Sequence, residues 1–194
     1  MKRSDSRTTP GKVRIIGGAL RGSRLVVPDA PGLRPTPDRA RETVFNWLAP
    51  IVVGADCLDL YAGTGAMGIE ALSRGAAACT FIERDRAAAR LLGDNVARLK
   101  LDHAQVVQAD VAKFLGGSAR PFDLVFLDPP FAANLWKPAA MSLEERGWLR
   151  PDAWIHVEMP LAARLEFPVT WQMHREGRAG AMRHVLYRRF STPC

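Results

Sequence analysis

The sequence has little cysteine and no long apolar run. It contains three cysteines in 194 residues, and Cys57, Cys79 and Cys194 lie too far apart for metal-ligand spacing. Cys57 and Cys79 stand in apolar runs, so we expect two buried free thiols. No stretch of about 18 apolar residues is present, which argues against a membrane-spanning helix. Residues 1–10 lack the apolar segment of a secretory signal, so we expect a cytoplasmic protein without a metal.

Acidic residues are scarce at the start of the chain. Residues 1–42 contain ten Lys or Arg and four Asp or Glu, an excess of six out of a net charge of +7. Solubility alone would not require such a concentration, so it favours a polyanionic partner, most simply nucleic acid. The chain has no zinc-finger, helix-turn-helix or RNP pattern that would specify the partner further.

Strand-like and helix-like segments alternate from residue 56 onward. Apolar or β-branched runs predict strands at 56–61, 78–82, 104–108, 122–127 and 154–158. The segments between them predict helices at 66–74, 86–99, 111–115 and 136–146. Two further runs, 171–176 and 182–190, predict a hairpin that turns at 177–180. This order is typical of an α/β fold with a mostly parallel, doubly wound sheet and an antiparallel hairpin at one edge.

The residues before this core have a different character. Two short β-branched runs, separated by glycines and closed by prolines, predict a small β-rich arm. A helix is expected over 36–48, with Thr36 as its cap and Pro37 at its first position. The chain thus divides into a disordered tail (1–11), an arm with a helix (12–50) and a core (51–194).

A glycine-rich loop follows the first core strand. Residues 59–68 read Asp-Leu-Tyr-Ala-Gly-Thr-Gly-Ala-Met-Gly and contain G-x-G-x-x-G at a turn from strand to helix. Glycines there allow a tight bend and the close approach of a ligand. Glu83 stands 20 residues after Gly63, at the end of the next strand, where a carboxylate accepts hydrogen bonds from ribose hydroxyls. The loop therefore predicts a nucleotide-like cofactor.

Asp59 separates the two cofactor classes that share this arrangement. A dinucleotide would bring a pyrophosphate that the carboxylate repels, whereas S-adenosylmethionine brings an ammonium and a sulfonium. Asp110 follows the third core strand, where it can accept a hydrogen bond from the adenine amine and also cap the helix that begins at Val111. Acids at successive strand ends lie where open α/β sheets bind ligands. We therefore expect S-adenosylmethionine, with a nicotinamide dinucleotide as the alternative.

The fourth core strand ends in Phe-Leu-Asp-Pro-Pro-Phe, residues 126–131. Because proline stops a strand and stiffens the backbone after it, the segment could be only a strand end. Amine methylation gives it a further role. Asp128 and the carbonyl of Pro129 can hold the two N–H groups of an exocyclic amine, Pro130 keeps the turn rigid, and Phe131 offers a face for a flipped-out base. We expect catalysis by positioning and electrostatics, without a covalent enzyme intermediate.

These residues resemble a known family. The Asp-Pro-Pro-Phe element is similar to that of amino-methyltransferases with the class I S-adenosylmethionine-dependent fold. Further segments resemble the bacterial small-subunit ribosomal RNA guanine-N2 methyltransferases. These segments are Arg14–Gly18, Leu33–Thr36, Asp38–Glu42, Phe45–Leu48, Asp59–Gly75 and Phe126–Phe131. The N-terminal segments narrow the resemblance, because the glycine loop and Asp-Pro-Pro-Phe occur in many methyltransferases.

The resemblance implies a fold, a reaction and a site. The fold is a Rossmann-like class I methyltransferase with a seven-stranded sheet. The reaction transfers a methyl group from S-adenosylmethionine to the exocyclic N2 amine of one guanine of 16S rRNA, in assembled small (30S) subunits, by a monomer without a metal. The cofactor residues are Asp59, Tyr61, Ala62, Gly63, Thr64, Gly65, Glu83, Arg84, Asp110, Val111 and Asp128. The RNA residues are Arg14, Arg21, Arg34, Arg39 and Phe131, and the catalytic residues are Asp128, Pro129, Pro130 and Phe131.

Other functions remain open at this stage. A dehydrogenase would share the glycine loop but would need a hydride-handling site, and a non-catalytic RNA-binding module would not need acids at three strand ends. Methylation of adenine N6, cytosine N4 or a protein glutamine amide would use the same Asp-Pro-Pro chemistry. The basic N-terminal segment argues against the protein substrate. The histidines show no pairing with a nucleophile and no metal spacing, so we expect structural roles for His103, His156, His174 and His184.

Overall fold

The computed structural model describes residues 12–27, 37–131 and 134–190. Two strands precede the core, β1 (Lys12–Arg14) and β2 (Arg24–Val26). The strands of the main sheet are β3 (Asp56–Leu60), β4 (Ala78–Glu83), β5 (Ala104–Gln108), β6 (Phe122–Leu127), β7 (Leu149–Pro160), β8 (Trp171–Ala179) and β9 (Met182–Arg189). The helices are α1 (Asp38–Leu48), α2 (Ala66–Ser73), α3 (Arg86–Arg98), α4 (Val111–Leu115) and α5 (Trp136–Glu145).

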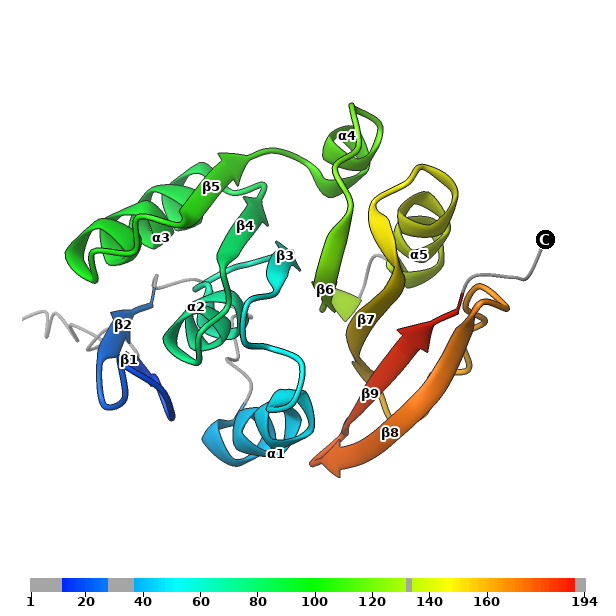
Figure 1. The fold of residues 1–194 in the computed structure, drawn as a ribbon, viewed down its shortest axis with the longest axis horizontal. Helices are drawn as coiled ribbons and strands as arrows, with labels where there is room; N and C mark the ends of the chain where they lie inside the picture. Colours follow the sequence, from blue (N-terminus) through cyan, green and yellow to red (C-terminus); the bar gives the residue numbers. More distant parts are fainter. Residues whose placement is uncertain (1–11, 28–36, 132–133, 191–194) are drawn as a thin grey trace, which may run out of the picture.

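One seven-stranded sheet forms the centre of the molecule (Figure 1). Its strand order is β5-β4-β3-β6-β7-β9-β8, and β1 pairs with β2 in a small sheet of their own. The strands from β5 to β7 are parallel, whereas β9 is antiparallel to both β7 and β8. The predicted fold class, a doubly wound and mostly parallel sheet with an antiparallel C-terminal hairpin, is confirmed.

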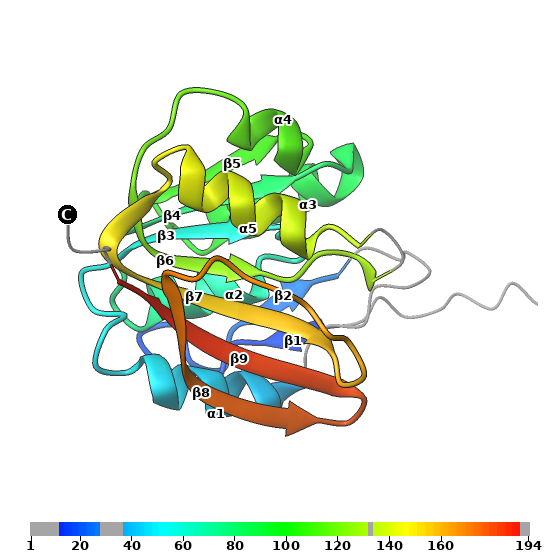
Figure 2. The same cartoon turned by 90° about the vertical axis from the view of Figure 1, so that its right-hand side faces the viewer.

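Helices cover both faces of the sheet. Because alternate residues of a strand point to opposite faces, each strand contributes side chains to both cores. On β6, Leu124 and Phe126 join the apolar cluster beneath α1, α2 and α3, whereas Val125 and Leu127 join the cluster beneath α4 and α5. Figure 2 shows α4 and α5 lying over the strands. The chain leaves β3 toward one face and β6 toward the other. The point between these neighbouring strands is where open α/β sheets bind ligands.

The arm packs on the same core as α1, α2 and α3. Val13, Ile15, Leu25 and Val27 are buried in the apolar cluster of that face. Cys57 and Cys79 are buried free thiols, as predicted. Within the described ranges, no helix is long and apolar enough to cross a membrane, and no group of His, Cys, Asp and Glu side chains could hold a metal ion.

Two local predictions were wrong. The hairpin turn lies at residues 180–181 instead of 177–180, because Gly177 remains in β8. A Cβ at this glycine would lie 2.9 Å from Cη2 of Trp47 on α1, so glycine allows the strand to pass beneath the helix rather than to turn. Pro37 is the cap residue of α1 and not its first helical residue. Thr36, the tail over 1–11, Arg34 and Cys194 lie outside the described residues.

Candidate functional site

The loop over residues 61–65 joins the carboxyl end of β3 to α2. Tyr61, Gly63 and Gly65 have φ angles of 63°, 52° and 74°, in the left-handed region that glycine adopts without strain. Tyr61 is unusual there, and backbone strain of this kind clusters at functional sites. A Cβ at Gly65 would lie 2.3 Å from Cδ1 of Leu92. The close approach of this loop to α3 therefore requires glycine.

Asp59 is buried beneath this loop. Its Oδ2 accepts a hydrogen bond from the N–H of Gly68 at 3.0 Å. Burial raises the pKa of Asp59 to about 8, against the lowering effect of the Gly68 hydrogen bond and with a further increase from the charge of Glu83. A carboxyl group with this pKa is mostly protonated at pH 7 and ionises when a cation lies close to it. The sequence predicted a carboxylate beside the loop, and the raised pKa makes its charge depend on what binds.

Glu83 ties the loop to the end of β4. Its Oε2 accepts a hydrogen bond from the N–H of Gly63 at 2.8 Å, and its Oε1 accepts one from the N–H of Asp85 at 2.7 Å. Since each carboxylate oxygen has two lone pairs, both oxygens keep acceptor capacity for a hydroxyl group. Two other loop residues named from the sequence, Ala62 and Thr64, are buried.

Asp110 follows β5 and caps α4, as predicted. Its Oδ1 accepts hydrogen bonds from the N–H groups of Ala112 at 2.9 Å and Lys113 at 3.3 Å. After burial, the charge of Asp110 is the second cause that raises the pKa of Tyr61 to about 12. Val111 is buried in the apolar core beneath α4, so its side chain is not open to a ligand.

A cavity of about 540 Å³ opens beside Asp110, within the usual size range of small-molecule sites. Arg84, which follows Glu83 and is exposed, stands at this cavity together with Asp110. Its lining residues are Arg84, Gln108, Ala109, Asp110, Lys113, Phe114, Gly117, Ser118 and Trp148. Two of the candidate cofactor residues, Arg84 and Asp110, therefore border a space that is open to a ligand.

The Asp-Pro-Pro-Phe segment leaves β6 at the same edge of the sheet. Asp128 is half-buried, Pro129 is buried and Pro130 is exposed, while Phe131 is 53% exposed. Burial raises the pKa of Asp128 well above its usual range, and the negative charges of Glu158 and Asp59 add to the effect. An exposed aromatic ring thus lies next to a carboxyl group that protein surroundings hold partly out of water.

Strand pairing brings the four predicted acids to one edge. Leu60 pairs with both Ile82 and Leu127, so the residues that follow β3, β4 and β6 lie side by side. Glu83 pairs with Gln108, which places Asp110 next along the same edge. The juxtaposition of Asp59, Glu83, Asp110 and Asp128 that the sequence suggested is present in the structure.

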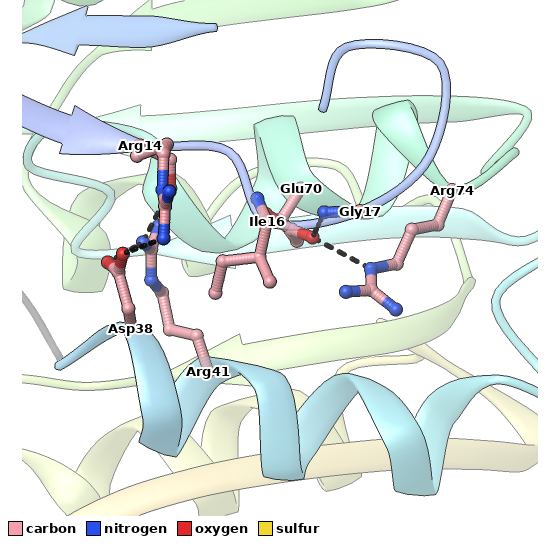
Figure 3. A network of polar contacts seen from close by, with 7 residues as sticks. All are labelled: Arg14, Ile16, Gly17, Asp38, Arg41, Glu70 and Arg74. Atoms are coloured by element: carbon pink, nitrogen blue, oxygen red, sulfur yellow. Dashed lines mark hydrogen bonds and ion pairs between the residues drawn. The ribbon is translucent and has the colours of Figure 1, made fainter. Parts of the chain in front are cut away.

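The sequence did not reveal how the arm is attached. Glu70 on α2 is fully buried, and its two oxygens accept hydrogen bonds from the N–H groups of Ile16 at 2.7 Å and Gly17 at 2.8 Å (Figure 3). Arg74, the residue that caps the carboxyl end of α2, donates from Nε to Oε1 of Glu70 at 2.8 Å. The spacing of Glu70 and Arg74 is a helical i, i+4 pair that could have indicated an ion pair. Their contact with the arm has no local signal.

Arg41 is a second buried charge at the arm. It donates to the carbonyl oxygen of Arg14 and to Oδ1 of Asp38, each at 2.7 Å. Because it is fully buried, Arg41 holds the arm to α1 and does not present a charge to a ligand.

The other candidate RNA residues of the described chain are exposed. The side chain of Arg14 is 62% exposed and lies 3.4 Å from Oδ2 of Asp38. Arg21 and Arg39 are exposed as well. These three arginines present positive charge to solvent on or beside the arm, where a polyanion would reach them.

Two of the histidines form a buried stacked pair. The rings of His156 and His184 are 5.6 Å apart at 10°. Burial lowers the pKa of His156 to about 3, with a contribution from His184, and burial lowers the pKa of His184 too. Neutral, buried rings fit the structural role expected from the sequence.

Comparison with known proteins places these features in a family. The family described as Conserved hypothetical protein 95 matches residues 13–188. Ribosomal RNA small subunit methyltransferase D of Escherichia coli strain K12 is 50% identical over 180 residues, which cover 92% of this chain and 91% of that protein. The protein of the same name from Haemophilus influenzae is 42% identical over 191 residues, covering 96% and 99%.

A solved structure agrees with the sequence comparisons. The structure described as putative methyltransferase yhhF from Escherichia coli matches with a TM-score of 0.86 and 48% identity, over 94% of this chain and 100% of that chain. The family match over residues 13–188 includes the arm, the glycine loop and the Asp-Pro-Pro-Phe segment. The chain belongs to the Conserved hypothetical protein 95 family, and ribosomal RNA small subunit methyltransferases D are among its relatives.

Proposed function

We propose that this protein transfers a methyl group from S-adenosylmethionine to the exocyclic N2 amine of a guanine in 16S rRNA of the small ribosomal subunit. The observation that carries the proposal is the half-buried Asp128, set beside the glycine loop with the exposed ring of Phe131 just beyond it. The names of the relatives, ribosomal RNA small subunit methyltransferase D, support ribosomal RNA as the substrate. The fit of cofactor and base to these residues supports the rest.

The residues at the strand ends fit S-adenosylmethionine. Gly63 and Gly65 have left-handed backbone conformations and no side chains, so a ligand could approach the loop closely. Glu83 has acceptor capacity for ribose hydroxyls. Asp110 borders the cavity, where its carboxylate would accept a hydrogen bond from the adenine amine. The ammonium and sulfonium groups would favour the ionised form of Asp59, so its negative charge would be present once the cofactor is bound. The cofactor, when bound, supplies an electrophilic methyl group on a positively charged sulfur.

Asp128 and Pro129 would position the amine. The lone pair of the guanine N2 is delocalised into the ring, so the nitrogen is a weak nucleophile until its two N–H groups are held. Asp128 accepts one N–H and the carbonyl of Pro129 accepts the other, which directs the lone pair at the methyl carbon. S-adenosylmethionine would supply the methyl carbon with its sulfur as the leaving atom, so the amine would gain one methyl group and lose one proton. The methylated nitrogen is cationic and releases its proton readily to water, so the reaction needs no strong base.

The test is methyl transfer from labelled S-adenosylmethionine to small ribosomal subunits that lack the modification. Naked 16S rRNA and total protein serve as parallel substrates, and nucleoside analysis identifies the product. We expect label in N2-methylguanosine, with assembled subunits as the better substrate. Label in N6-methyladenosine or N4-methylcytidine would keep the chemistry and overturn the base, and label only in protein would favour a glutamine amide.

Substitution of Asp128 tests the mechanism in the same assay. Asp128→Ala should lower kcat by about a hundredfold or more, as loss of a preorganised polar contact does, while the Kd for S-adenosylmethionine changes little. Asp128→Asn, which keeps one acceptor oxygen, should lose less. Asp102→Ala is a matched control, because Asp102 is exposed and precedes β5 at the opposite edge of the sheet. Turnover close to the wild-type rate in Asp128→Ala would exclude the amine-orienting role.

A further inference from the structure

Phe131 does not stand alone on the surface. Its ring lies parallel to the indole of Trp136, with ring centroids 6.2 Å apart and planes inclined by 7°. Offset parallel rings at this separation attract each other. Phe131 is 53% exposed, whereas Trp136 is only 3% exposed. The pair therefore consists of a buried aromatic ring behind an open one.

Trp136 is fixed in place by two kinds of contact. Its Nε1–H donates to the carbonyl oxygen of Glu158 on β7 at 2.8 Å, and its ring belongs to the apolar cluster beneath α5. β7 is the strand that pairs with β6, and Leu127, just before Asp128, pairs with Val157, just before Glu158. The positions of Trp136 and Asp128 are therefore both set by the same pair of strands, β6 and β7.

The residue two positions before Trp136 also has an unusual backbone geometry. Asn134 has a φ angle of 47°, in the left-handed region that asparagine tolerates better than most residues. The next residue, Leu135, caps α5 without a side-chain hydrogen bond. Asn134 thus has a left-handed backbone two residues before Trp136, the first residue of α5, and a bulky indole is not needed to begin a helix.

We propose that Trp136 is a positioning residue for the target base. It holds the Phe131 ring in one plane, so that a flipped-out base stacks on the open side of Phe131 with its exocyclic amine level with Asp128. The inference rests on the proposed function, because it assigns Phe131 to the base. It predicts that Trp136 acts on substrate affinity only through Phe131, and not on the cofactor.

Trp136→Leu and Trp136→Phe test this proposal on unmodified small subunits. We expect Trp136→Leu to raise KM for the subunit about five- to tenfold, with the Kd for S-adenosylmethionine unchanged by calorimetry. Trp136→Phe should restore most of the affinity, because a flat ring remains behind Phe131. An unchanged KM in Trp136→Leu, with Phe131→Ala impaired, would overturn the proposal while leaving the proposed function intact.

The chain offers a closely matched control at Trp171. This tryptophan is 5% exposed, its Nε1 donates to Oε2 of Glu144 at 2.9 Å, and it stacks on Phe167 at 5.8 Å and 10°. It begins β8 beside Arg189, near the amino end of β7 and away from the site. Trp171→Leu should lower Tm as Trp136→Leu does but leave KM unchanged. An equal rise of KM in both variants would mean a general loss of stability and overturn the proposal.

A double-mutant cycle separates action through Phe131 from independent action. If Trp136 acts through Phe131, the double variant Trp136→Leu with Phe131→Ala should have the same KM as Phe131→Ala alone. Multiplied effects on KM would overturn the proposal. A Phe131→Ala variant with wild-type KM would instead remove the base-stacking part of the proposed function, and a wild-type enzyme that methylates no guanine would remove the function itself.

Discussion

Single residues of the site carry charges that depend on their surroundings, and Asp59 is the clearest case. Its pKa of about 8 means that, at pH 7, binding a cationic ligand must displace a proton from this buried carboxyl. Proton release of this kind makes ligand affinity depend on pH through thermodynamic linkage. The gain in ligand affinity with rising pH ends near the pKa of Asp59. The amino group of the ligand, with a pKa of about 8, loses its own charge in the same pH region.

The first residue-scale prediction concerns cofactor affinity. The Kd for S-adenosylmethionine should fall several-fold between about pH 6.5 and about pH 8 and not improve above that, because deprotonated Asp59 is the form that binds. Calorimetry in two buffers of different ionisation enthalpy should detect proton release. Asp59→Asn should bind more weakly and lose this pH dependence, whereas Asp94→Asn, on the exposed side of α3, should behave as wild type. Equal Kd values at both pH values would contradict the prediction.

The second residue-scale prediction concerns His156. Its pKa falls from 6.5 to about 3 on burial, and among the described residues neither ring nitrogen has a hydrogen-bond partner. Because the unfolded chain binds the proton more tightly, His156 contributes stability that is fully present above its unfolded pKa of 6.5 and is lost as the pH falls toward 3. His156→Phe should therefore reduce the fall of Tm between about pH 6.5 and about pH 4.5.

The slope of Tm against pH, not Tm itself, is the readout for this substitution. Some slope should remain, since the pKa of His184 is lowered as well. His103 is exposed, so His103→Gln should leave the slope unchanged. An identical slope in His156→Phe and wild type would show that the acid sensitivity of the fold comes from other groups.

At the scale of elements, Glu70 joins the arm to α2. Glu70→Ala would leave two N–H groups and the guanidinium of Arg74 without their acceptor, and removing one partner of a buried charged network costs about 3–5 kcal/mol. We expect a loss of unfolding free energy of this size in denaturant titration, with faster tryptic cleavage of the arm at Arg14 and Arg21. Glu70→Gln, which keeps one acceptor oxygen, should lose less. Glu145→Ala, at an exposed position of α5, is the control, and an arm that resists trypsin equally in all variants would argue against the anchor.

The elements themselves were largely predictable, because their signals are local. Apolar runs of strand length identified β3, β4, β5 and β6, and the glycine loop identified the turn into α2. Since parallel pairing aligns strand ends, the order of the acids along the edge followed from the alternation of strands and helices. The sequence thus located the site without showing any contact between its residues.

Contacts between distant residues were not predictable. Glu70 accepts from residues 54 and 53 positions away, and no periodicity records such a pairing. The need for glycine at position 18 also arises from a distant residue, because a Cβ there would lie 1.8 Å from the carbonyl oxygen of Ser73. Gly177 was misread as a turn because only the packing of Trp47 explains a glycine within β8. The charge state of Asp59 also depends on burial, which the sequence pattern does not quantify.

For the whole molecule, the distribution of charge matters more than its total. The excess of positive charge lies in residues 1–42. Of this segment, residues 13–27 pack against the face of the sheet that carries α2 and α3. Arg14, Arg21 and Arg39 are exposed on the arm or on α1. The buried Arg41 instead donates to the Arg14 carbonyl and to Asp38. The arm thus combines internal cations that hold it in place with external cations that meet solvent.

The whole-molecule prediction is that these exposed arginines bind phosphate. Each phosphate contact releases condensed counterions and contributes about −0.7 to −0.9 to the slope of log K against log salt, so three contacts should give a slope of about −2 or steeper. Arg21→Ala and Arg39→Ala should each make the slope shallower by about 1. Filter binding of unmodified small subunits over a range of monovalent salt, at fixed magnesium, measures it. Arg146→Ala, exposed after α5, should keep the wild-type slope, and a wild-type slope near zero would mean that the basic segment does not contact RNA.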